Sequence, residues 1–243
     1  MQARAIFEAA INIRNKGKNP IPEIEVPNII NLKEFKLIKD IIEKVAIDSG
    51  AKGIIDYKIG TMIEFPRAVM IADELAKEAE FMSFGTNDLT QTTLGFSRDD
   101  AGRFIPIYVE KNVLKNDPFQ TIDQEGVGEF MKFAIEKARK TNKNIDIGIC
   151  GEHGGDPESV EFCHRIGLSN VSCSPFRVPI ARLATGQAAI KEKKKKEEEA
   201  VKNAMIKSLE EIKKKFGKTI NIEDLENEIN KIISGKSSGY STA

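Results

Sequence analysis

Short apolar runs alternate with longer amphipathic segments along the first 190 residues, and this alternation most limits what the chain can fold into. Five runs are typical of strands, at 24–30, 59–65, 81–85, 145–150 and 170–174. The other segments have the 3.6-residue period of helices, at 2–16, 31–48, 66–79, 125–141, 157–166 and 177–190. Strands rich in β-branched residues that alternate with helices predict parallel β/α units. We therefore expect an α/β fold with about five parallel strands.

Two α/β architectures accommodate five such units, an open doubly wound sheet and part of a (β/α)8 TIM barrel. No Gly-x-Gly-x-x-Gly or Walker A sequence follows a predicted strand, so the strongest sign of a nucleotide-binding sheet is missing. Polar residues gather instead where successive strands end, which is where barrel active sites are built. The sequence favours a partial barrel. The connection 86–124 is long for a compact domain, which predicts a functional lid or binding loop.

Glu64 is the first polar residue at a strand end, after an apolar run and before Pro66. Proline cannot continue the hydrogen bonding of a strand, so the strand ends near Glu64. A carboxylate at that strand end would face the mouth of a barrel. Taken alone, Glu64 fits a functional ligand and a surface partner for Arg67 equally well.

The second polar strand end begins at Gly85, which permits a sharp turn. Thr86 and Asn87 can then offer backbone N–H groups to an anionic oxygen. Asp88 is a second hard oxygen ligand, and Mg2+ is commonly held by one or two carboxylates together with substrate oxygens and water. Glu64 and Asp88 together would therefore be enough protein ligands for one Mg2+ ion. The alternative is a turn that only caps a helix, since Asn and Asp favour both.

Cys150 ends the fourth predicted strand and opens the glycine-rich loop Cys-Gly-Glu-His-Gly-Gly. A thiol near a metal-bound enolate can give a proton to carbon, and so can the imidazole of His153. The residue types alone do not choose between them. Cys163 and Cys173 are typical of small buried hydrophobic residues.

These stretches together resemble the phosphoenolpyruvate-utilising enzymes. Residues 80–91, Glu-Phe-Met-Ser-Phe-Gly-Thr-Asn-Asp-Leu-Thr-Gln, are similar to the C-terminal signature of that family. Three further stretches, 95–102, 150–155 and 172–179, resemble its pyruvate, phosphate dikinase branch, and the first ten residues resemble an internal helix of the same enzymes. The resemblance covers about residues 1–190 and none of the rest.

The resemblance implies the phosphoenolpyruvate/pyruvate-binding part of a phosphotransferase. Such an enzyme interconverts pyruvate and phosphoenolpyruvate by Mg2+-assisted phosphoryl transfer between a phosphohistidine and the pyruvate enolate. It implies Glu64 and Asp88 as the metal ligands and Cys150, in preference to His153, as the catalytic proton donor. Met62 corresponds to a residue that lines the pocket for the reacting carbon. The implied substrate-binding residues are Met62, Glu64, Gly85, Thr86, Asn87 and Asp88.

The sequence also departs from that family. Five strands are fewer than the eight of a closed barrel. No segment resembles the family's ATP-grasp or phosphohistidine domain, and its two phosphate-binding arginines have no match among Arg4, Arg14, Arg67 and Arg98. Because positioning and electrostatics supply most of phosphoryl-transfer catalysis, we expect the isolated chain to be inactive or dependent on the missing domains.

Two other interpretations stay open beside the incomplete enzyme. One is a noncatalytic metal- or partner-binding remnant of a split or truncated gene, and the other is a Mg2+-dependent 2-oxo acid lyase. An open arc of strands leaves two edges uncovered. The C-terminal helices would cover them, or a second chain would, as in a homodimer.

Composition changes near residue 190, so we expect two domains, 1–190 as the C-terminal half of the barrel and 191–243 as a charged helical tail. The Lys/Glu run 191–199 favours helix, and apolar residues form one stripe of a further helix up to Gly217. Asn221 is placed to cap a second helix, and 234–242 are expected to be disordered. Either a solvated appendage or a partner-binding hairpin fits this tail.

Bulk properties exclude several classes of partner. Lysine plus arginine and aspartate plus glutamate number 37 each, which argues against nucleic acid or an anionic membrane. No apolar run approaches the roughly 20 residues that span a bilayer, and the N-terminus lacks a signal peptide. Three cysteines without a Cys-x-x-Cys spacing favour a reducing cytoplasm. An organelle presequence upstream of Met1 is compatible with the same residues.

Overall fold

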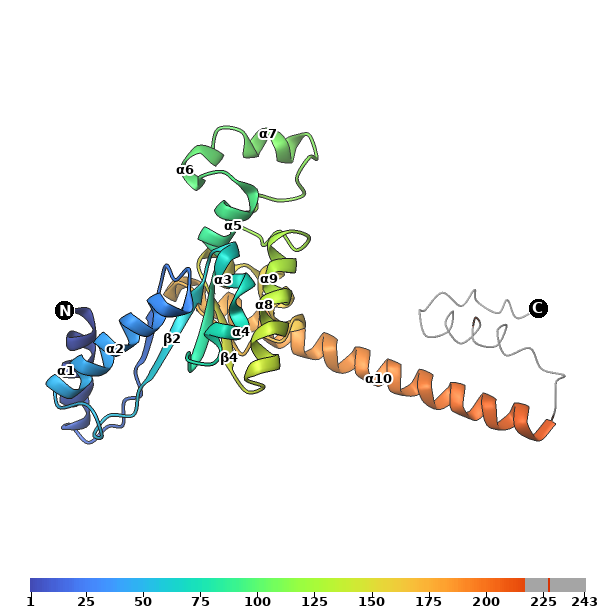
Figure 1. Ribbon diagram of the computed structural model, residues 1–243. Helices are drawn as coiled ribbons and strands as arrows, with labels where there is room; N and C mark the ends of the chain where they lie inside the picture. Colours follow the sequence, from blue (N-terminus) through green and yellow to red (C-terminus); the bar gives the residue numbers. More distant parts are fainter. Residues whose placement is uncertain (217–226, 228–243) are drawn as a thin grey trace. The chain divides into compact units, whose positions relative to one another are not determined.

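The computed structural model describes residues 1–216 and residue 227, and the chain divides into two units, Met1–Thr185 and Gly186–Ala243 (Figure 1). The strands are β1 (Glu23–Val26), β2 (Lys58–Ile63), β3 (Phe81–Gly85), β4 (Asp146–Cys150) and β5 (Asn170–Val171). The α-helices are α1 (Gln2–Arg14), α2 (Leu32–Asp48), α3 (Pro66–Met70), α4 (Ala72–Leu75), α5 (Thr86–Leu94), α6 (Arg98–Ala101), α7 (Ile105–Glu110), α8 (Val127–Thr141), α9 (Pro157–Arg165) and α10 (Val178–Phe216). Two 3-10 turns are η1 (Glu152–Gly155) and η2 (Pro175–Arg177).

The strands form one parallel sheet with the order β1-β2-β3-β4-β5, so each strand pairs with the next one in the chain. A doubly wound sheet would reverse its strand order at a switch point, and the described sheet does not. A steady progression of parallel strands is how the wall of a (β/α)8 barrel is built. The predicted α/β fold with five parallel strands, a partial barrel, is confirmed.

The two faces of the sheet differ in burial. Side chains that alternate along a strand point to opposite faces, and residues paired in register share a face. Ile63, Phe84 and Ile149 are in register on the outer face, and all three are almost fully buried in the main core beneath the helices. Met62 and Ser83 are in register on the opposite, inner face, and both are only half-buried. In the structure as described, the inner face is therefore the accessible one.

Local backbone chemistry explains where the elements differ from the sequence prediction. The first strand ends at Val26 instead of residue 30, because Pro27 follows it and Asn28 has a φ of 59°. The predicted helix 66–79 is two short helices, separated at Ile71, whose φ and ψ of −115° and 21° are not helical. Neither difference displaces Glu64, which directly follows β2.

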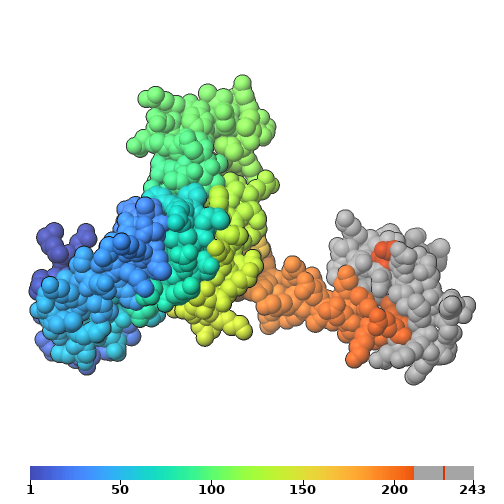
Figure 2. Space-filling model, viewed as in Figure 1, coloured from blue at the N-terminus to red at the C-terminus, as the bar shows by residue number. Residues whose placement is uncertain are grey.

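The prediction of one long loop at 86–124 is wrong, because α5, α6 and α7 lie within it. Of these, α6 and α7 with their flanking segments form a lobe with an apolar cluster of its own, in which Ala101, Ile105 and Phe119 are buried. Leu89 of α5 is buried in the main core instead. The Phe96 ring packs edge-on against Phe104 at a centroid distance of 5.1 Å. Figure 2 shows the residues of α6 and α7, in green, gathered on one side of the first unit. The apolar residues of this segment therefore pack with one another instead of lining an irregular loop.

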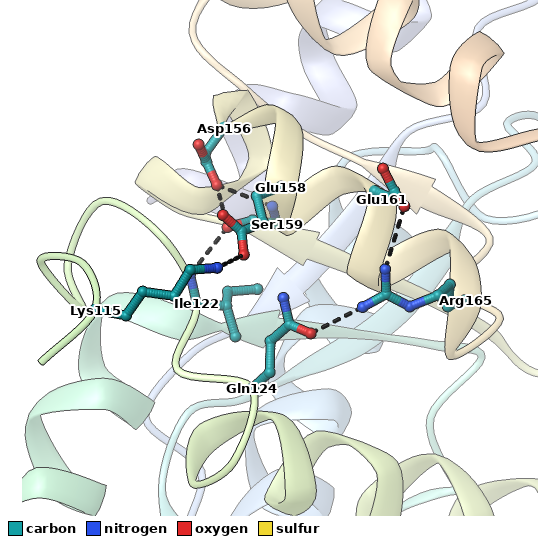
Figure 3. A network of polar contacts seen from close by, with 8 residues as sticks. All are labelled: Lys115, Ile122, Gln124, Asp156, Glu158, Ser159, Glu161 and Arg165. Carbon is teal, nitrogen blue, oxygen red and sulfur yellow. Dashed lines mark hydrogen bonds and ion pairs between the residues drawn. The ribbon is translucent and has the colours of Figure 1, made fainter. Parts of the chain in front are cut away.

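The segment that returns from this lobe is attached to α9 by polar contacts (Figure 3). The Ile122 N–H donates to Ser159 Oγ at 2.9 Å, and this contact is buried. Lys115 pairs with Glu158 at 2.8 Å, and Arg165 donates to the Gln124 side chain at 2.8 Å. The buried contact with Ser159 fixes the end of the lobe segment, whereas exposed pairs add little.

The second unit is described as far as Phe216, by the C-terminal part of α10. Its lysines and glutamates pair one turn apart, as in Lys193 with Glu197 at 3.8 Å and Lys195 with Glu199 at 3.9 Å. Such i,i+4 pairs stabilise a solvated helix by a few tenths of a kcal/mol each. The predicted stop at Gly217, the helix after Asn221 and the disordered 234–242 lie outside the described residues, and the boundary at residue 190 stays a prediction. In the described chain, no helix is long and apolar enough to span a membrane.

Candidate active site

The predicted site residues lie at the carboxyl ends of three neighbouring strands. Met62 is on the inner face of β2, and Glu64 directly follows that strand. Gly85 ends β3, and Cys150, its register partner, ends β4. Thr86, Asn87 and Asp88 form the first turn of α5.

Glu64 and Asp88 come together as a pair of carboxylates. Glu64 is 4% exposed, and its Oε1 accepts the backbone N–H of Asn28 at 2.5 Å. Burial raises the pKa of Glu64, the Asn28 N–H partly opposes this, and the charge of Asp88 and a hydrogen bond with it raise the pKa further. A buried carboxylate whose charge is disfavoured both by burial and by a neighbouring carboxylate is an arrangement that a bound cation would relieve.

The donor set fits Mg2+. Both groups supply hard oxygen atoms, and Mg2+ takes one or two protein carboxylates and leaves its other positions to substrate oxygens and water. Among the described residues, no three His, Cys, Asp or Glu side chains lie together as a metal-binding group. Glu64 and Asp88 would thus be the protein's share of the coordination.

Gly85 is required by close packing. A Cβ atom at this position would lie 2.6 Å from the Met62 sulfur and 2.7 Å from Glu64 Cβ, closer than real Cβ contacts come. Its φ and ψ, −81° and 76°, lie outside the left-handed region. Position 85 therefore requires glycine because the Met62 and Glu64 side chains occupy the space that a Cβ atom would need.

The first turn of α5 supplies backbone donors beside these carboxylates. The first N–H groups of a helix have no partner within it, so those of Thr86 and Asn87 can bind an anionic oxygen. A helix does begin at Thr86, but its N-cap is Gly85 and no side-chain hydrogen bond caps it. The Asn87 side chain accepts the Glu152 N–H at 3.4 Å, and Gly151, with a φ of 98°, passes close to it. Asn87 thereby joins the α5 turn to the loop after Cys150.

Cys150 is half-buried at the end of β4, and its thiol donates to the Phe84 carbonyl oxygen at 3.6 Å. Burial raises the pKa of this thiol, and the charges of Glu25, Glu64 and Asp88 raise it further, against a hydrogen bond from Ser83. At neutral pH the group is thus a thiol, which is the form that can give a proton.

His153 is fully buried, with both ring nitrogens in hydrogen bonds. Nε2 lies 2.9 Å from the Pro118 carbonyl oxygen, which only accepts, so Nε2 carries the proton. Nδ1 lies 2.7 Å from the Thr86 hydroxyl, which is also 3.1 Å from the Cys150 carbonyl oxygen. The imidazole joins the lobe segment to α5, and this engagement favours Cys150 over His153 as the proton donor.

His153 makes stability depend on pH with a definite sign. Burial lowers its pKa below the ordinary value, so the folded chain keeps the ring neutral while the unfolded chain binds a proton near pH 6.5. The contribution of the neutral His153 ring to folding stability is complete above that pH, and it is lost as the pH falls toward the lower folded pKa. We expect His153→Gln to weaken the fall in melting temperature between about pH 7.5 and pH 5. Equal slopes in the wild-type and His153→Gln chains would contradict the assignment.

Four residues near the site were not predicted. Asn28 acts through its backbone, which side-chain patterns do not report. Gln91 donates to Asp88 Oδ1 at 3.0 Å and accepts the Arg98 N–H at 2.8 Å, so it links the carboxylate to the lobe. Glu25 and Ser83 are polar side chains on the inner face of otherwise apolar strands. The period-2 alternation of Ile24, Glu25 and Val26 was the available signal.

Parallel β/α units with carboxylates, a thiol and a helix N-terminus at adjoining strand ends define a barrel-type α/β domain with a candidate active site at its strand ends. Residues 1–190 match the family described as PEP-utilising enzyme, PEP-binding domain. The chain belongs to this family, as the resemblance indicated.

Curated relatives extend the comparison. Pyruvate, phosphate dikinase 1, chloroplastic, of Arabidopsis thaliana is 58% identical over 192 residues, which are 78% of this chain and 20% of that protein. The Zea mays protein of the same name is 56% identical over 194 residues, 78% of this chain and 20% of its own length. Pyruvate, phosphate dikinase of Clostridium symbiosum is 54% identical over 196 residues, 79% of this chain and 22% of that protein. The chain thus spans about a fifth of the length of these relatives.

Proposed function

We propose that this chain is the phosphoenolpyruvate/pyruvate-binding part of a pyruvate, phosphate dikinase, and that it takes part in phosphoryl transfer between a phosphohistidine and the pyruvate enolate. The observation that carries the proposal is the pairing of the buried Glu64 with the half-buried Asp88 at the strand ends, next to the helix N-terminus of α5 and the Cys150 thiol. The dikinase relatives, at 54–58% identity, support the same reaction.

Each group in the site has a role in this proposal. Glu64 and Asp88 hold Mg2+, which when bound supplies Lewis-acid stabilisation of an enolate oxygen. The N–H groups of Thr86 and Asn87 orient the substrate carboxylate. Met62 borders the space for the reacting carbon, and Cys150 gives its thiol proton to that carbon or, as thiolate, takes one from the methyl group of pyruvate.

The proposal treats the chain as incomplete by itself. The matched 192 and 196 residues are only 20% and 22% of these relatives, and the chain carries five barrel strands in its described residues. A phosphohistidine domain, an ATP-grasp domain and the remaining barrel strands would act with it. The three cysteines are free, and the cytoplasm remains the proposed location.

Titration calorimetry with Mg2+ and oxalate, an enolate mimic, tests the binding function of the isolated chain. We expect oxalate to bind only with Mg2+ present and the Asp88→Ala chain to lose at least about 100-fold in affinity, since weaker outer-shell changes already cost 10- to 100-fold at metal sites. Asp48→Asn removes an exposed carboxylate at the end of α2 and is the matched control.

The other interpretations give different results in the same experiment. A noncatalytic remnant would show no oxalate binding, and its Asp88→Ala variant would be indistinguishable from the wild type. A Mg2+-dependent lyase would bind oxalate and also cleave a 2-oxo acid without a phosphohistidine. Binding without such turnover is the result that the dikinase proposal requires.

A further inference from the structure

Gln91 is a half-buried side chain beside the candidate metal ligands, and the proposed mechanism does not use it. It lies on α5, three residues after Asp88, so the two side chains share one face of the helix. Its Nε2 donates to Asp88 Oδ1 at 3.0 Å. Its Oε1 accepts the backbone N–H of Arg98 at 2.8 Å. One side chain therefore contacts both a candidate metal ligand and the segment that enters the lobe.

These two partners fix which way the Gln91 amide points. A backbone N–H can only donate, so the amide must present its oxygen to Arg98. Its NH2 group then faces Asp88, whose ionised carboxylate can only accept. The reverse orientation would place donor against donor at Arg98 and acceptor against acceptor at Asp88. The contact with the lobe segment therefore determines that Gln91 donates to Asp88.

The turn after α5 is what brings Arg98 back to Gln91. The helix ends at Leu94, and Gly95 follows in the left-handed region with a φ of 74°. The Gln91 carbonyl oxygen accepts the N–H of Gly95 at 2.9 Å and the N–H of Phe96 at 3.2 Å. Arg98 is the first residue of α6, where an N–H has no partner within its own helix. Gln91 supplies that partner, so its backbone and side chain together hold the start of the lobe.

A neutral amide is well suited to orient a metal ligand. A carboxylate has two oxygens, so a hydrogen bond to Oδ1 of Asp88 leaves the second oxygen available to a cation. Because the NH2 group carries no net charge, it holds the carboxylate without the repulsion that a lysine or arginine would exert on Mg2+. Hydrogen bonds of this kind to ligating carboxylates commonly raise metal affinity by about 10- to 100-fold.

We propose that Gln91 is a positioning residue for Asp88, and that the Arg98 N–H of the lobe holds it in place. The affinity of the site for Mg2+ then depends on how the lobe begins, although the lobe supplies no ligand in this proposal. The inference rests on the proposed role of Asp88 as a metal ligand.

Gln91→Met tests the hydrogen bond to Asp88 in the full chain. Methionine keeps the length and helix propensity of the side chain but has no NH2 donor. Titration calorimetry gives the Mg2+ midpoint, meaning the Mg2+ concentration at which oxalate binding is half-maximal. We expect this midpoint to rise about 10-fold. The affinity for oxalate at saturating Mg2+ should change by less than about twofold, because Gln91 acts on the metal ligand and not on oxalate.

The two titrations separate positioning from a structural role. Equal losses in the Mg2+ midpoint and in the oxalate affinity at saturating Mg2+ would show a general disturbance of α5 and would overturn the proposal. An unchanged Mg2+ midpoint would overturn it as well.

Gln120→Met is the matched control. Gln120 donates its Nε2 to Asp117 Oδ2 at 3.1 Å, so it makes the same kind of bond to an aspartate three residues before it, at an exposed position. The substitution should leave the Mg2+ midpoint unchanged. A rise as large as that of Gln91→Met would contradict the role assigned to Gln91.

Arg98→Pro tests the contribution of the lobe. Proline is favoured at the first position of a helix, and Ser97, with φ and ψ of −75° and 144°, already has the extended backbone that precedes proline. Proline lacks the N–H that Gln91 accepts, whereas Arg98→Ala removes the same side chain and keeps the N–H. We expect the Mg2+ midpoint to be roughly threefold higher with proline than with alanine, since the amide loses one of its two partners. Equal midpoints would overturn the coupling to the lobe.

A metal-free measurement distinguishes this proposal from the proposed function. The NMR resonances of the Gln91 side-chain NH2 group need neither Mg2+ nor oxalate. Asp88→Ala and Arg98→Pro should each shift them, and Gln120→Met should not. Resonances that stay in place in the Asp88→Ala chain would overturn the proposal. A wild-type chain that binds no oxalate would instead count against the proposed function, and the NH2 resonances would still decide the contacts of Gln91.

Discussion

Glutamine in place of Glu64 is expected to stabilise the chain while abolishing its Mg2+-dependent binding of oxalate. Burial and the neighbouring Asp88 raise the pKa of Glu64, so its charge opposes folding at neutral pH. Glutamine is uncharged and keeps a carbonyl oxygen that can accept the Asn28 N–H. We expect the melting temperature at neutral pH to rise by about 3 °C, the shift that roughly 1 kcal/mol gives in a chain of this size.

The sign of the pH dependence follows from the raised pKa. As the pH falls through the folded pKa of Glu64, the carboxyl is protonated and its unfavourable charge disappears. The stability difference between Glu64→Gln and the wild type should therefore be largest at neutral pH and narrow in acid. Thermal melts across this range, with oxalate titrations at neutral pH, measure both effects.

Glu78 is a suitable control because its pKa is shifted in the opposite direction to that of Glu64. Its ion pair with Lys36, at 2.8 Å, lowers the pKa of the Glu78 carboxyl, so Glu78→Gln should lower stability slightly and leave oxalate binding intact. If Glu64→Gln lowered stability and binding together, Glu64 would be a structural residue, and its assignment as a metal ligand would be wrong.

The Cys150→Ala change has the other large expected effect, in a complete enzyme. Residues 1–190 would replace the corresponding segment of the Clostridium symbiosum dikinase, to which the chain is 54% identical. In this chimera, Cys150→Ala should lower pyruvate formation by at least about 1000-fold, since proton transfer by a positioned group contributes about 100- to 10,000-fold. The ATP-dependent half-reaction, which needs no proton on carbon, should remain.

Separate assays of the two half-reactions measure this effect. Cys173→Ala, at a half-buried cysteine outside the proposed site, should leave both half-reactions intact. Loss of both in the Cys150→Ala chimera would show that Cys150 maintains the fold of the β4 loop. Pyruvate formation at the wild-type rate would exclude it as the proton donor.

Sequence periodicity predicted the strands well because each is a short apolar run between helices. It also located Glu64, Asp88 and Cys150 at strand ends, since polar residues after buried strands have few structural uses. The lobe of α6 and α7 was missed because its apolar residues pack mainly with one another, as Phe96 does with Phe104, and follow no long helical period. A short helix of four to six residues leaves little periodic signal.

Sequence patterns could not identify residues that act through their backbone or that depend on a neighbour in the fold. The Asn28 N–H reaches Glu64 because of a φ of 59° after Pro27, which no composition reveals. That Glu25 and Ser83 lie on the same face is known only once β1 and β3 are placed in one sheet. Cys150 and His153 were equal candidates by residue type. The burial of the His153 ring and its two hydrogen bonds are tertiary facts.

The crowding at Gly85 also limits how the chain could be engineered for stability. Its backbone angles are open to other residues, and alanine at such a position ordinarily stabilises a protein by reducing the freedom of the unfolded chain. Here a methyl group would displace the Met62 sulfur and the Glu64 side chain. A glycine-to-alanine change at residue 85 would therefore disturb the candidate site instead of stabilising the chain.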